Sequence, residues 1–431
     1  MIGVKGAGLS ALALILKDLG NTVVGYDDEK KYQFTEDKLI DAGIKIYSDN
    51  SFNLTSDMIV IRSTAVKFDH PEILKANAKK IKIYEYNEFL GELTKEFQTV
   101  AVSGCHGKTT TTSMLKTVVD KILGCNYLVG DGSGYADKEN RLFLIEACEY
   151  RRNFLAYNPS ISVITNIDLD HVDYFKDIDD VKEAYQDFAN KTKDLVVIYG
   201  DDANSRSLKI DTETLYYGLE AYNDVVASNV VYDENGINFS VDIKEEHLGH
   251  FSLPFYGRHL LLNTLAVIAV ADYLGIKPEL IQERLAEFKG ANRRFNEVII
   301  NDNVVVDDYA HHPSEIRATI EAARQKYPDK DIVVVFEPHT FSRTKEFAKE
   351  IAEALNQADE VHVTEIFKSR EKKENFPDVT SEIIIKELYN GKFLERNIEP
   401  LENYTNSVML FMSPKDIDDI RLALIERLKD F

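Results

Sequence analysis

The chain has 431 residues, enough for roughly two to four domains, and its 44% hydrophobic and 29% charged content allows several buried cores. Its 73 acidic and 51 basic side chains give a formal charge of −22, which opposes binding to nucleic acids and to anionic membranes. No apolar run reaches the roughly 18 residues of a membrane span, and no signal-peptide pattern is present. Three scattered cysteines exclude a disulfide framework or a zinc–thiolate site. We expect a soluble, cytoplasmic protein without membrane insertion, whose oligomeric state the sequence leaves open.

Strand-like and helical segments alternate along the chain, which indicates parallel sheets built from βαβ units. A glycine-rich turn at 3–8 is followed by an expected helix at 9–19 and a strand at 21–26. Further strands are expected at 99–102, 142–145, 161–164, 195–199 and 332–336, and amphipathic helices at 110–122 and 316–326. New motifs begin at Gly104 and after Gly290. We therefore predict an α/β protein with three domains, over residues 1–95, 96–292 and 293–431.

The first glycine turn has two possible interpretations. Its spacing, with Gly3, Gly6 and Gly8, allows a diphosphate to approach a helix N-terminus, and Asp27 after the next strand could accept a hydrogen bond from a ribose hydroxyl. The alternative is a tight turn without a ligand. Only two residues precede Gly3, whereas a strand usually needs about five, so the first strand is either short or begins upstream.

A second glycine-rich loop, at 104–110, follows a strand and opens a helix. Its Gly-Lys-Thr sequence is typical of a phosphate-binding loop, in which backbone N–H groups hold phosphates, Lys108 reaches the β- and γ-phosphates, and the Thr109 hydroxyl binds Mg²⁺. Gly104 lies three residues before Gly107 rather than five, which departs from the usual spacing. The loop predicts ATP binding.

Polar residues at the ends of two further strands support this prediction. Glu146 ends one strand, and Asn166 follows another, with Asp168, Asp170 and His171 just beyond. Ligands of open parallel sheets lie at the carboxyl ends of the strands. Magnesium prefers oxygen ligands, so His171 taken alone is better explained as a capping histidine. Whether Glu149, Arg151 and Arg152 form a solvated or a substrate-facing turn stays open.

Several motifs together resemble one family. The 104–109 loop resembles the Gly-Thr-His-Gly-Lys-Thr loop of the Mur ligases, ATP-dependent enzymes of peptidoglycan precursor synthesis. Residues 165–171 resemble that family's Thr-Asn-Ile-x-x-Asp-His segment, and 257–263 its adenine-side helix. Asp-Asp-Tyr-Ala-His-His-Pro at 307–313 and Phe-Glu-Pro-His-Thr-Phe-Ser-Arg-Thr at 336–344 are similar to the members that add the first amino acid.

The resemblance implies an architecture and a reaction. It implies a Rossmann-like UDP-sugar-binding domain, a central P-loop-type ATPase domain with a mainly parallel sheet, and a C-terminal Rossmann-like amino-acid-binding domain. With ATP as cosubstrate and Mg²⁺, the expected reaction joins L-alanine to the lactyl carboxylate of UDP-N-acetylmuramate. Since a carboxylate is a poor acyl donor, phosphoryl transfer would first form an acyl phosphate, which the amine then attacks.

The resemblance also implies roles for particular residues. Lys108, Glu146, His171 and Arg343 are the expected catalytic residues, with Thr109 and Glu146 holding one Mg²⁺ and Glu146 with His171 a second. ATP would contact the loop and four further positions: Gly104, Cys105, His106, Gly107, Lys108, Thr109, Thr110, His259, Asn263, Arg294 and Asp308. The substrates would contact Gly6, Ala7 and Gly8 (diphosphate), Asp27 and Ser63 (uridine side), Asn166, and His312 with Arg343 (acceptor and its carboxylate). His311 and His339 are expected to fix turns.

This chain departs from the family pattern in ways that leave the phosphate-transfer residues in place. Cys105 stands where threonine is usual, Cys148 where aspartate is common, and Leu260 where asparagine follows the histidine. Cys105 is either an inert small side chain, which we favour, or an oxidisable thiol at a helix N-terminus. Alternative functions are a ligase that attaches a preformed tripeptide during cell-wall recycling, a non-catalytic nucleotide-binding protein, and, from the first glycine turn alone, a dehydrogenase.

Overall fold

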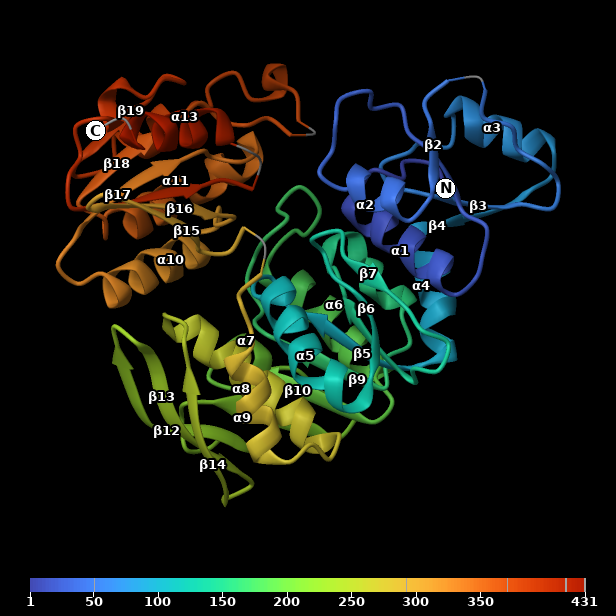
Figure 1. Cartoon of the computed structure of the whole chain (residues 1–431), viewed down its shortest axis with the longest axis horizontal. Helices are drawn as coiled ribbons and strands as arrows, with labels where there is room; N and C mark the ends of the chain where they lie inside the picture. The colour runs from blue at the N-terminus through green and yellow to red at the C-terminus, as the bar shows by residue number, and fades with distance from the viewer. Residues whose placement is uncertain (50, 292, 370, 415–416, 430–431) are drawn as a thin grey trace. The chain divides into compact units, whose positions relative to one another are not determined.

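The computed structural model describes residues 1–49, 51–291, 293–369, 371–414 and 417–429 (Figure 1). The chain divides into two compact units. Unit 1 comprises residues 1–168, 179–226 and 265–287, and unit 2 comprises residues 169–178, 227–264 and 288–431. The three domains with limits 1–95, 96–292 and 293–431 stay a prediction, and residue 292 lies outside the described residues. Among the described residues no helix is both long and apolar enough to cross a membrane.

The first part of unit 1 is a small parallel sheet with helices. Its strands pair as β1 with β2 and β3 with β4, and Ile2 makes parallel bridges to Tyr26 and to Arg62. Ile2, at the position of the predicted first strand, therefore lies between β1 and β3. The elements are α1 (Ala7–Asp18), β1 (Val24–Tyr26), α2 (Glu36–Asp41), β2 (Lys45–Tyr47), β3 (Ile59–Arg62), α3 (Pro71–Ala78), β4 (Lys82–Glu85), α4 (Tyr86–Leu93) and η1 (Thr94–Glu96).

The larger sheet of unit 1 has the strand order β7-β6-β8-β5-β9-β10-β11, and β11 continues the pairing to the first residues of β12. All these pairs are parallel except β6 with β7. The strands are β5 (Gln98–Ser103), β6 (Cys125–Leu128), β7 (Gly134–Tyr135), β8 (Leu142–Glu146), β9 (Ile161–Ile164), β10 (Leu195–Tyr199), β11 (Thr214–Gly218) and β12 (Val225–Asp233). Because β5 lies between β8 and β9, the carboxyl ends of these three strands are neighbours.

These strands form because their sequences suit a sheet that is covered on both faces. The apolar residues of β8, β9 and β10 are buried in continuous runs rather than alternately, as expected for central parallel strands. The helical elements are α5 (Lys108–Leu123), η2 (Tyr150–Ala156), α6 (Ile178–Lys191), α7 (Ala203–Arg206) and α9 (Pro278–Ala286). On this sheet, α9 packs against α5, where the Arg284 guanidinium donates to the Thr117 carbonyl at 2.9 and 3.1 Å.

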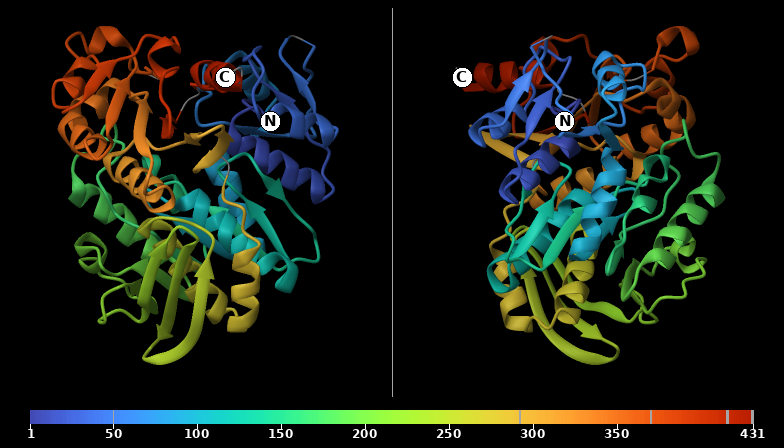
Figure 2. Two further views of the ribbon diagram at one scale, coloured as in Figure 1. Left: turned by 60° about the vertical axis from the view of Figure 1, so that its left-hand side comes forward. Right: turned by 90° about the vertical axis from the view of Figure 1, so that its right-hand side faces the viewer.

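Unit 2 contains an antiparallel hairpin and a six-stranded sheet. The hairpin pairs β13 (Gly236–Ile243) with β14 (Glu246–Leu253) and appears as long yellow-green strands in Figure 2. Helix α8 (Arg258–Tyr273) begins in unit 2 and ends in unit 1. The six-stranded sheet has the order β15-β16-β20-β17-β18-β19 and is parallel except for β15 with β16.

Both faces of the six-stranded sheet carry an apolar core, as in a Rossmann-like domain. One core lies under α10 and α11 and includes Val334 and Leu410; the other lies under α13 and includes Val333 and Met409. The elements are β15 (Asn296–Ile300), β16 (Asn303–Asp308), α10 (Pro313–Lys326), β17 (Asp331–Phe336), α11 (Phe341–Leu355), β18 (Glu360–Val363), η3 (Lys373–Asn375), α12 (Glu382–Ile385), β19 (Gly391–Phe393), η4 (Glu399–Leu401), β20 (Ser407–Met412) and α13 (Asp418–Lys429).

Candidate active site

The loop between β5 and α5 has the geometry of a phosphate cradle. Gly104 and Gly107 have φ values of 139° and 81°, which side chains with a Cβ rarely adopt. A Cβ on Gly104 would also collide with the Thr165 hydroxyl. Gly107 is the N-cap of α5, and its left-handed backbone turns the chain into the helix at Lys108. The strand–loop–helix context predicted for residues 104–110 is therefore present, with the N-terminus of a 16-residue helix facing the loop.

Lys108 is held by a buried carboxylate that the sequence did not identify. Its Nζ donates to Glu149 Oε2 at 2.9 Å and to the carbonyl oxygen of Cys105 at 3.1 Å, and it also donates to the Gly104 carbonyl. Glu149 is 1% exposed, so this side chain of the turn is not solvated. Burial alone would lower the pKa of Lys108, but Glu149, together with smaller effects of neighbouring groups that include Glu146, raises this pKa above its usual range. The ammonium group is thus kept charged beside the loop.

Arg151 and Arg152, which follow Glu149 in the sequence, have different surroundings. Arg152 pairs with Asp180 at 2.6 Å and Glu183 at 2.9 Å on α6, and Arg151 is exposed. The only hint of a role for Glu149 in the sequence is its position three residues after a strand-end glutamate. An ion pair between a carboxylate and a lysine of different elements leaves no periodic pattern in the sequence.

Thr109 and Glu146 meet at the carboxyl ends of β5 and β8. The Thr109 hydroxyl donates to Glu146 Oε2 at 2.9 Å, and the Gly130 N–H donates to the same oxygen at 2.8 Å. A hydroxyl and a carboxylate are ligands that Mg²⁺ prefers, so these two side chains fit the predicted ion. His171, the other predicted metal ligand, belongs to unit 2 and has a φ of 50°.

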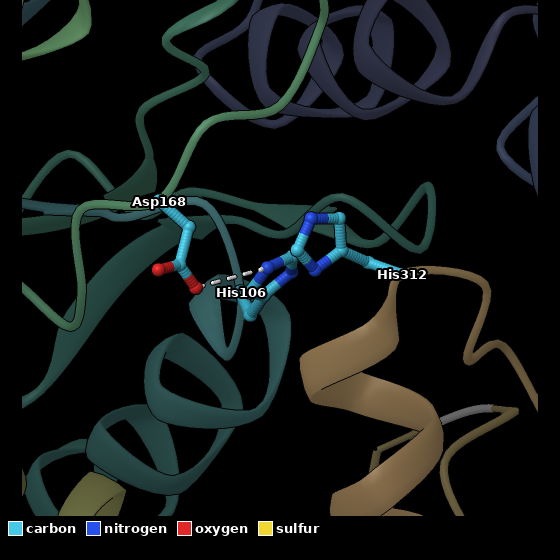
Figure 3. Close-up of side chains that lie close together, drawn as sticks. All are labelled: His106, Asp168 and His312. Carbon is cyan, nitrogen blue, oxygen red and sulfur yellow. Dashed lines mark ion pairs between the residues drawn. The ribbon is translucent and has the colours of Figure 1, made fainter. Parts of the chain in front are cut away.

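The segment after β9 braces the phosphate loop. Asn166 Oδ1 accepts from the His106 N–H at 2.9 Å, and its Nδ2 donates to the His106 carbonyl at 3.0 Å. The His106 ring lies 3.5 Å from the Asp168 carboxylate, the contact drawn as a dashed line in Figure 3. The Asn166 amide, predicted to face a substrate group, thus forms both of these hydrogen bonds with the loop backbone.

Cys105 is a further brace of the same loop. Its thiol donates to the Asp168 carbonyl at 3.0 Å and accepts from the Asp168 N–H at 3.2 Å. Burial, reinforced by the charge of Glu149, raises the pKa of Cys105 well above its usual value. Because the thiolate is the reactive form, these surroundings favour an inert side chain over an oxidisable one.

The first glycine turn leads into α1 with Gly6 as N-cap. Glycine supplies no capping side chain, so the first N–H groups, at Ala7 and Gly8, suit an anionic ligand. Asp27 is already engaged: its carboxylate accepts from the backbone N–H of Lys5 at 2.8 Å and of Glu29 at 3.0 Å.

Two other features lie near this turn. The Ser63 hydroxyl accepts from the Ala65 N–H at 3.3 Å, and the Ser63 N–H donates to Ile2. A cavity of about 590 Å³ borders the end of the turn at Lys5 and is lined by Lys5, Glu29, Lys30, Glu36, Ile40, Gly43, Ile44, Lys45, Ile46 and Ser48.

Unit 2 holds the residues predicted to contact adenosine. His259 and Asn263 are one turn apart on α8 and share a face. Burial, assisted by Arg294, lowers the pKa of His259 to about 4, so the ring is neutral near pH 7. Its Nδ1 is buried and makes no hydrogen bond within the described part of the chain.

Arg294 is half-buried, and Asp308 is buried. Arg294 pairs with Glu315 at 3.3 Å. Asp308, predicted to touch the ATP ribose, accepts from the N–H groups of Phe295 and Ala310, both at 2.8 Å. Burial raises the pKa of Asp308 against the opposing effect of Arg294. Its carboxylate therefore fixes the start of the segment that leads to α10.

His312 and Arg343 lie at the starts of two helices of unit 2. His312 is the N-cap of α10, with its Nδ1 accepting from the Ser314 N–H at 3.4 Å, and Figure 3 shows its ring at that helix start. The neighbouring His311 has its Nδ1 3.0 Å from the Tyr309 carbonyl and 3.1 Å from Glu315, as expected for a turn-fixing histidine.

Arg343, in the first turn of α11, forms a buried ion pair with Asp170. Arg343 Nη2 and Nε lie 2.7 and 3.2 Å from Asp170 Oδ1, and the two side chains are 8% and 7% exposed. Burial alone would raise the pKa of Asp170, but Arg343 and nearby histidines hold this pKa well below its usual range. Arg343 Nη1 lies 3.1 Å from His339 Nδ1. A further carboxylate at this guanidinium would have to bind N–H groups that Asp170 and His339 leave, or replace Asp170.

Comparison with known families covers most of the chain. Residues 1–98 match the model described as Mur ligase family, catalytic domain; residues 102–271 match the Mur ligase middle domain; and residues 293–416 match the Mur ligase, glutamate ligase domain. The chain belongs to the Mur ligase family. This Mur ligase has the family's three-domain α/β architecture, and it is a carbon–nitrogen bond-forming ligase of peptidoglycan precursor synthesis.

Solved structures resemble this Mur ligase over its full length. UDP-N-acetylmuramate–alanine ligase MurC of Thermotoga maritima is 26% identical, with a TM-score of 0.82, over 100% of this chain and 98% of that one. Two further structures share the fold. A murein peptide ligase of Psychrobacter arcticus is 20% identical, with a TM-score of 0.71, over 100% of this chain and 98% of that one. The MurF ligase of Thermotoga maritima in complex with ADP is 19% identical, with a TM-score of 0.67, over 96% of this chain and 97% of that one.

Proposed function

We propose that this Mur ligase joins L-alanine to the lactyl carboxylate of UDP-N-acetylmuramate, with ATP converted to ADP and phosphate. The observation that carries the proposal is the cradle at the carboxyl ends of β5, β8 and β9, where Lys108, Thr109 and Glu146 adjoin a glycine loop. The choice of L-alanine is supported by the motifs at 307–313 and 336–344 and by the full-length similarity to a MurC structure.

The first chemical step transfers the γ-phosphoryl group to the lactyl carboxylate. One carboxylate oxygen forms a bond to phosphorus, the bond from phosphorus to the β-phosphate oxygen breaks, and ADP leaves. The loop N–H groups and Lys108, exchanging Glu149 for phosphate oxygens, offset the negative charge that must be brought together. Thr109 and Glu146, with His171, would hold Mg²⁺, which when bound neutralises phosphate charge and orients the phosphates.

The second step forms the amide. The amine of alanine attacks the carbonyl carbon of the acyl phosphate, a tetrahedral intermediate forms, and phosphate leaves as the amine loses a proton. Positioning supplies much of the rate in such a step. We assign this positioning to His312 and Arg343, with the Arg343 guanidinium meeting the carboxylate of alanine.

The remaining assignments complete the proposal. Gly6, Ala7 and Gly8 hold the UDP diphosphate, with Asp27 and Ser63 shaping the uridine side through the turn that they brace. His259 and Asn263 face adenine, and Arg294 approaches ATP. Asp308 and Asn166 act on ATP and the sugar substrate through the segments that they fix. The N-terminal domain binds the UDP-sugar, the middle domain ATP, and the C-terminal domain the amino acid.

The experiment is phosphate release with ATP, Mg²⁺ and UDP-N-acetylmuramate, comparing L-alanine, no amino acid and L-Ala-D-Glu-meso-diaminopimelate. Release that depends on L-alanine is the expected result. Release with the tripeptide alone would make the protein a ligase of preformed peptides, in line with the name of the Psychrobacter relative, a murein peptide ligase. Absence of release in all three mixtures would favour a nucleotide-binding protein without turnover.

A further inference from the structure

The helix that carries Arg343 is capped by a carboxylate from a distant loop. Glu371 Oε2 accepts from the backbone N–H groups of Phe341, at 2.5 Å, and Ser342, at 3.1 Å, and its other oxygen accepts from the Ser342 hydroxyl. The N-cap residue itself, Thr340, makes no side-chain capping bond. The positive end of α11 is therefore neutralised by a residue 30 positions along the chain.

The backbone at this helix start is strained. Thr340 has φ 66° and ψ 144°, a region that β-branched residues rarely enter. Such a conformation persists only where surrounding contacts fix it. Here the Thr340 N–H donates to the Phe367 carbonyl at 2.9 Å, and the Phe367 N–H donates to the Pro338 carbonyl at 2.8 Å. The loop that ends in Glu371 thus holds both sides of the strained residue.

The same loop also positions the side chains of His339 and, through it, Arg343. The His339 backbone makes a parallel bridge to Phe367, and the two rings stack with centroids 5.8 Å apart. His339 Nδ1 in turn lies 3.1 Å from Arg343 Nη1. Phe367 and Glu371 therefore brace one continuous group, from Pro338 to Arg343, and among the described residues Glu371 is the charged partner of the N–H groups at the start of α11.

We propose that Glu371 is a positioning residue for the acceptor amino acid. Without this cap the first turn of α11 would lose the contacts that fix it, and with them the position of the Arg343 guanidinium that is to meet the acceptor's carboxylate. Glu371 fills that end of the helix and leaves the Arg343 and His339 pair as the cationic partner for the acceptor. The inference rests on the proposed acceptor role of Arg343 and extends it to a residue outside the motif at 336–344.

The test compares Glu371→Ala and Glu371→Gln with Glu374→Ala, a removal of an exposed glutamate on η3 of the same loop region. Kinetics use the full chain with whichever amino acid supports phosphate release. We expect Glu371→Ala to raise the KM for the amino acid by about tenfold or more, equivalent to roughly 1.4 kcal/mol. The KM values for ATP and the sugar nucleotide should stay within about twofold, because the proposal assigns neither ligand a contact with α11. Glu371→Gln should give a smaller rise, because its amide oxygen still accepts hydrogen bonds without the charge, and Glu374→Ala should match the unaltered protein.

A second measurement separates this role from a general loss of structure. Hydroxylamine, a nucleophile without a carboxylate, attacks an acyl phosphate to give a hydroxamate and phosphate. Hydroxamate formation should be the same in the Glu371 variants and the unaltered protein. An unchanged amino-acid KM, or an equal loss in amino-acid and hydroxylamine reactions, would overturn the proposal; if Glu371→Ala unfolds, Glu371→Gln decides. Absence of hydroxamate with the unaltered protein would count against the acyl phosphate of the proposed function, while the KM comparison would still decide on Glu371.

Discussion

Lys108 and Glu149 form an ion pair in which the side chains are 14% and 2% exposed and 2.9 Å apart. A charge buried to this degree is tolerated because its partner is present, and removing one partner of such a pair typically costs about 3–5 kcal/mol. Substituting Lys108 alone therefore mixes two effects. It removes the cation that meets the phosphates, and it leaves the Glu149 carboxylate buried without that cation.

A pair of variants separates these effects. We expect Lys108→Ala to abolish phosphate release and to lower the free energy of unfolding by about 3 kcal/mol. Adding Glu149→Gln should restore most of the stability, since no buried charge then lacks its partner, but should restore no phosphate release. Denaturant unfolding and a phosphate assay measure the two quantities. Turnover near the unaltered rate in the double variant would contradict the role of Lys108.

Several side chains that the motifs place at the site form hydrogen bonds with backbone groups of nearby loops. The Asp27 carboxylate accepts from Lys5 and Glu29, and the Asn166 amide bonds to both sides of the His106 backbone. Asp and Asn commonly fix turns in this way. The sequence places such residues beside a glycine-rich loop, but it does not distinguish a side chain that contacts a ligand from one that shapes the loop.

At the scale of the element, α10 begins with a capping box whose N-cap is a histidine. The His312 ring accepts from the Ser314 N–H at 3.4 Å, and the Glu315 carboxylate accepts from the His312 N–H at 3.4 Å. Pro313 follows at the first helical position, where its missing N–H costs nothing. His312 therefore has a structural role that is independent of its proposed contact with the acceptor.

Asparagine separates the two roles of His312, because it is among the best N-cap residues. We expect His312→Ala to lower the free energy of unfolding by about 1 kcal/mol, whereas His312→Asn should leave it within about 0.5 kcal/mol of the unaltered value. Both variants should raise the KM for the amino acid, since neither keeps the imidazole. Thermal or denaturant unfolding beside acceptor titrations gives both readouts. Unaltered kinetics in His312→Asn would show that this histidine is a helix cap only.

At the scale of the whole molecule, the central strands were predictable and the edges were not. The segments expected at 161–164 and 195–199 coincide with β9 and β10, and those at 99–102 and 142–145 lie within β5 and β8. Runs of apolar and β-branched residues buried on both faces leave a strong pattern. By contrast, the strand expected at 21–26 spans only Val24–Tyr26, and before Gly3 the described pairing is that of Ile2 with Tyr26 and Arg62.

The contacts that complete the site depend on the folded chain. Glu149 reaches Lys108 from 41 residues away, and Asp170 reaches Arg343 from 173 residues away. Neither pairing has a fixed spacing, so no sequence motif contains both partners. Gly104, Lys108 and Thr109 were predictable because a phosphate loop needs its glycines, lysine and hydroxyl in one short segment. The contact of Glu149 with Lys108, by contrast, could be identified only once the sheet brought β8 beside β5.

The central claim is that the lactyl carboxylate is activated by phosphorylation before it meets L-alanine. The most direct measurement uses UDP-N-acetylmuramate labelled with oxygen-18 in that carboxylate, together with ATP, Mg²⁺ and L-alanine, and follows the released phosphate and the product by mass spectrometry. The account predicts a sugar nucleotide heavier by one alanine residue and the transfer of one labelled oxygen to each phosphate released. Unlabelled phosphate, or phosphate released without an alanine adduct, would contradict it.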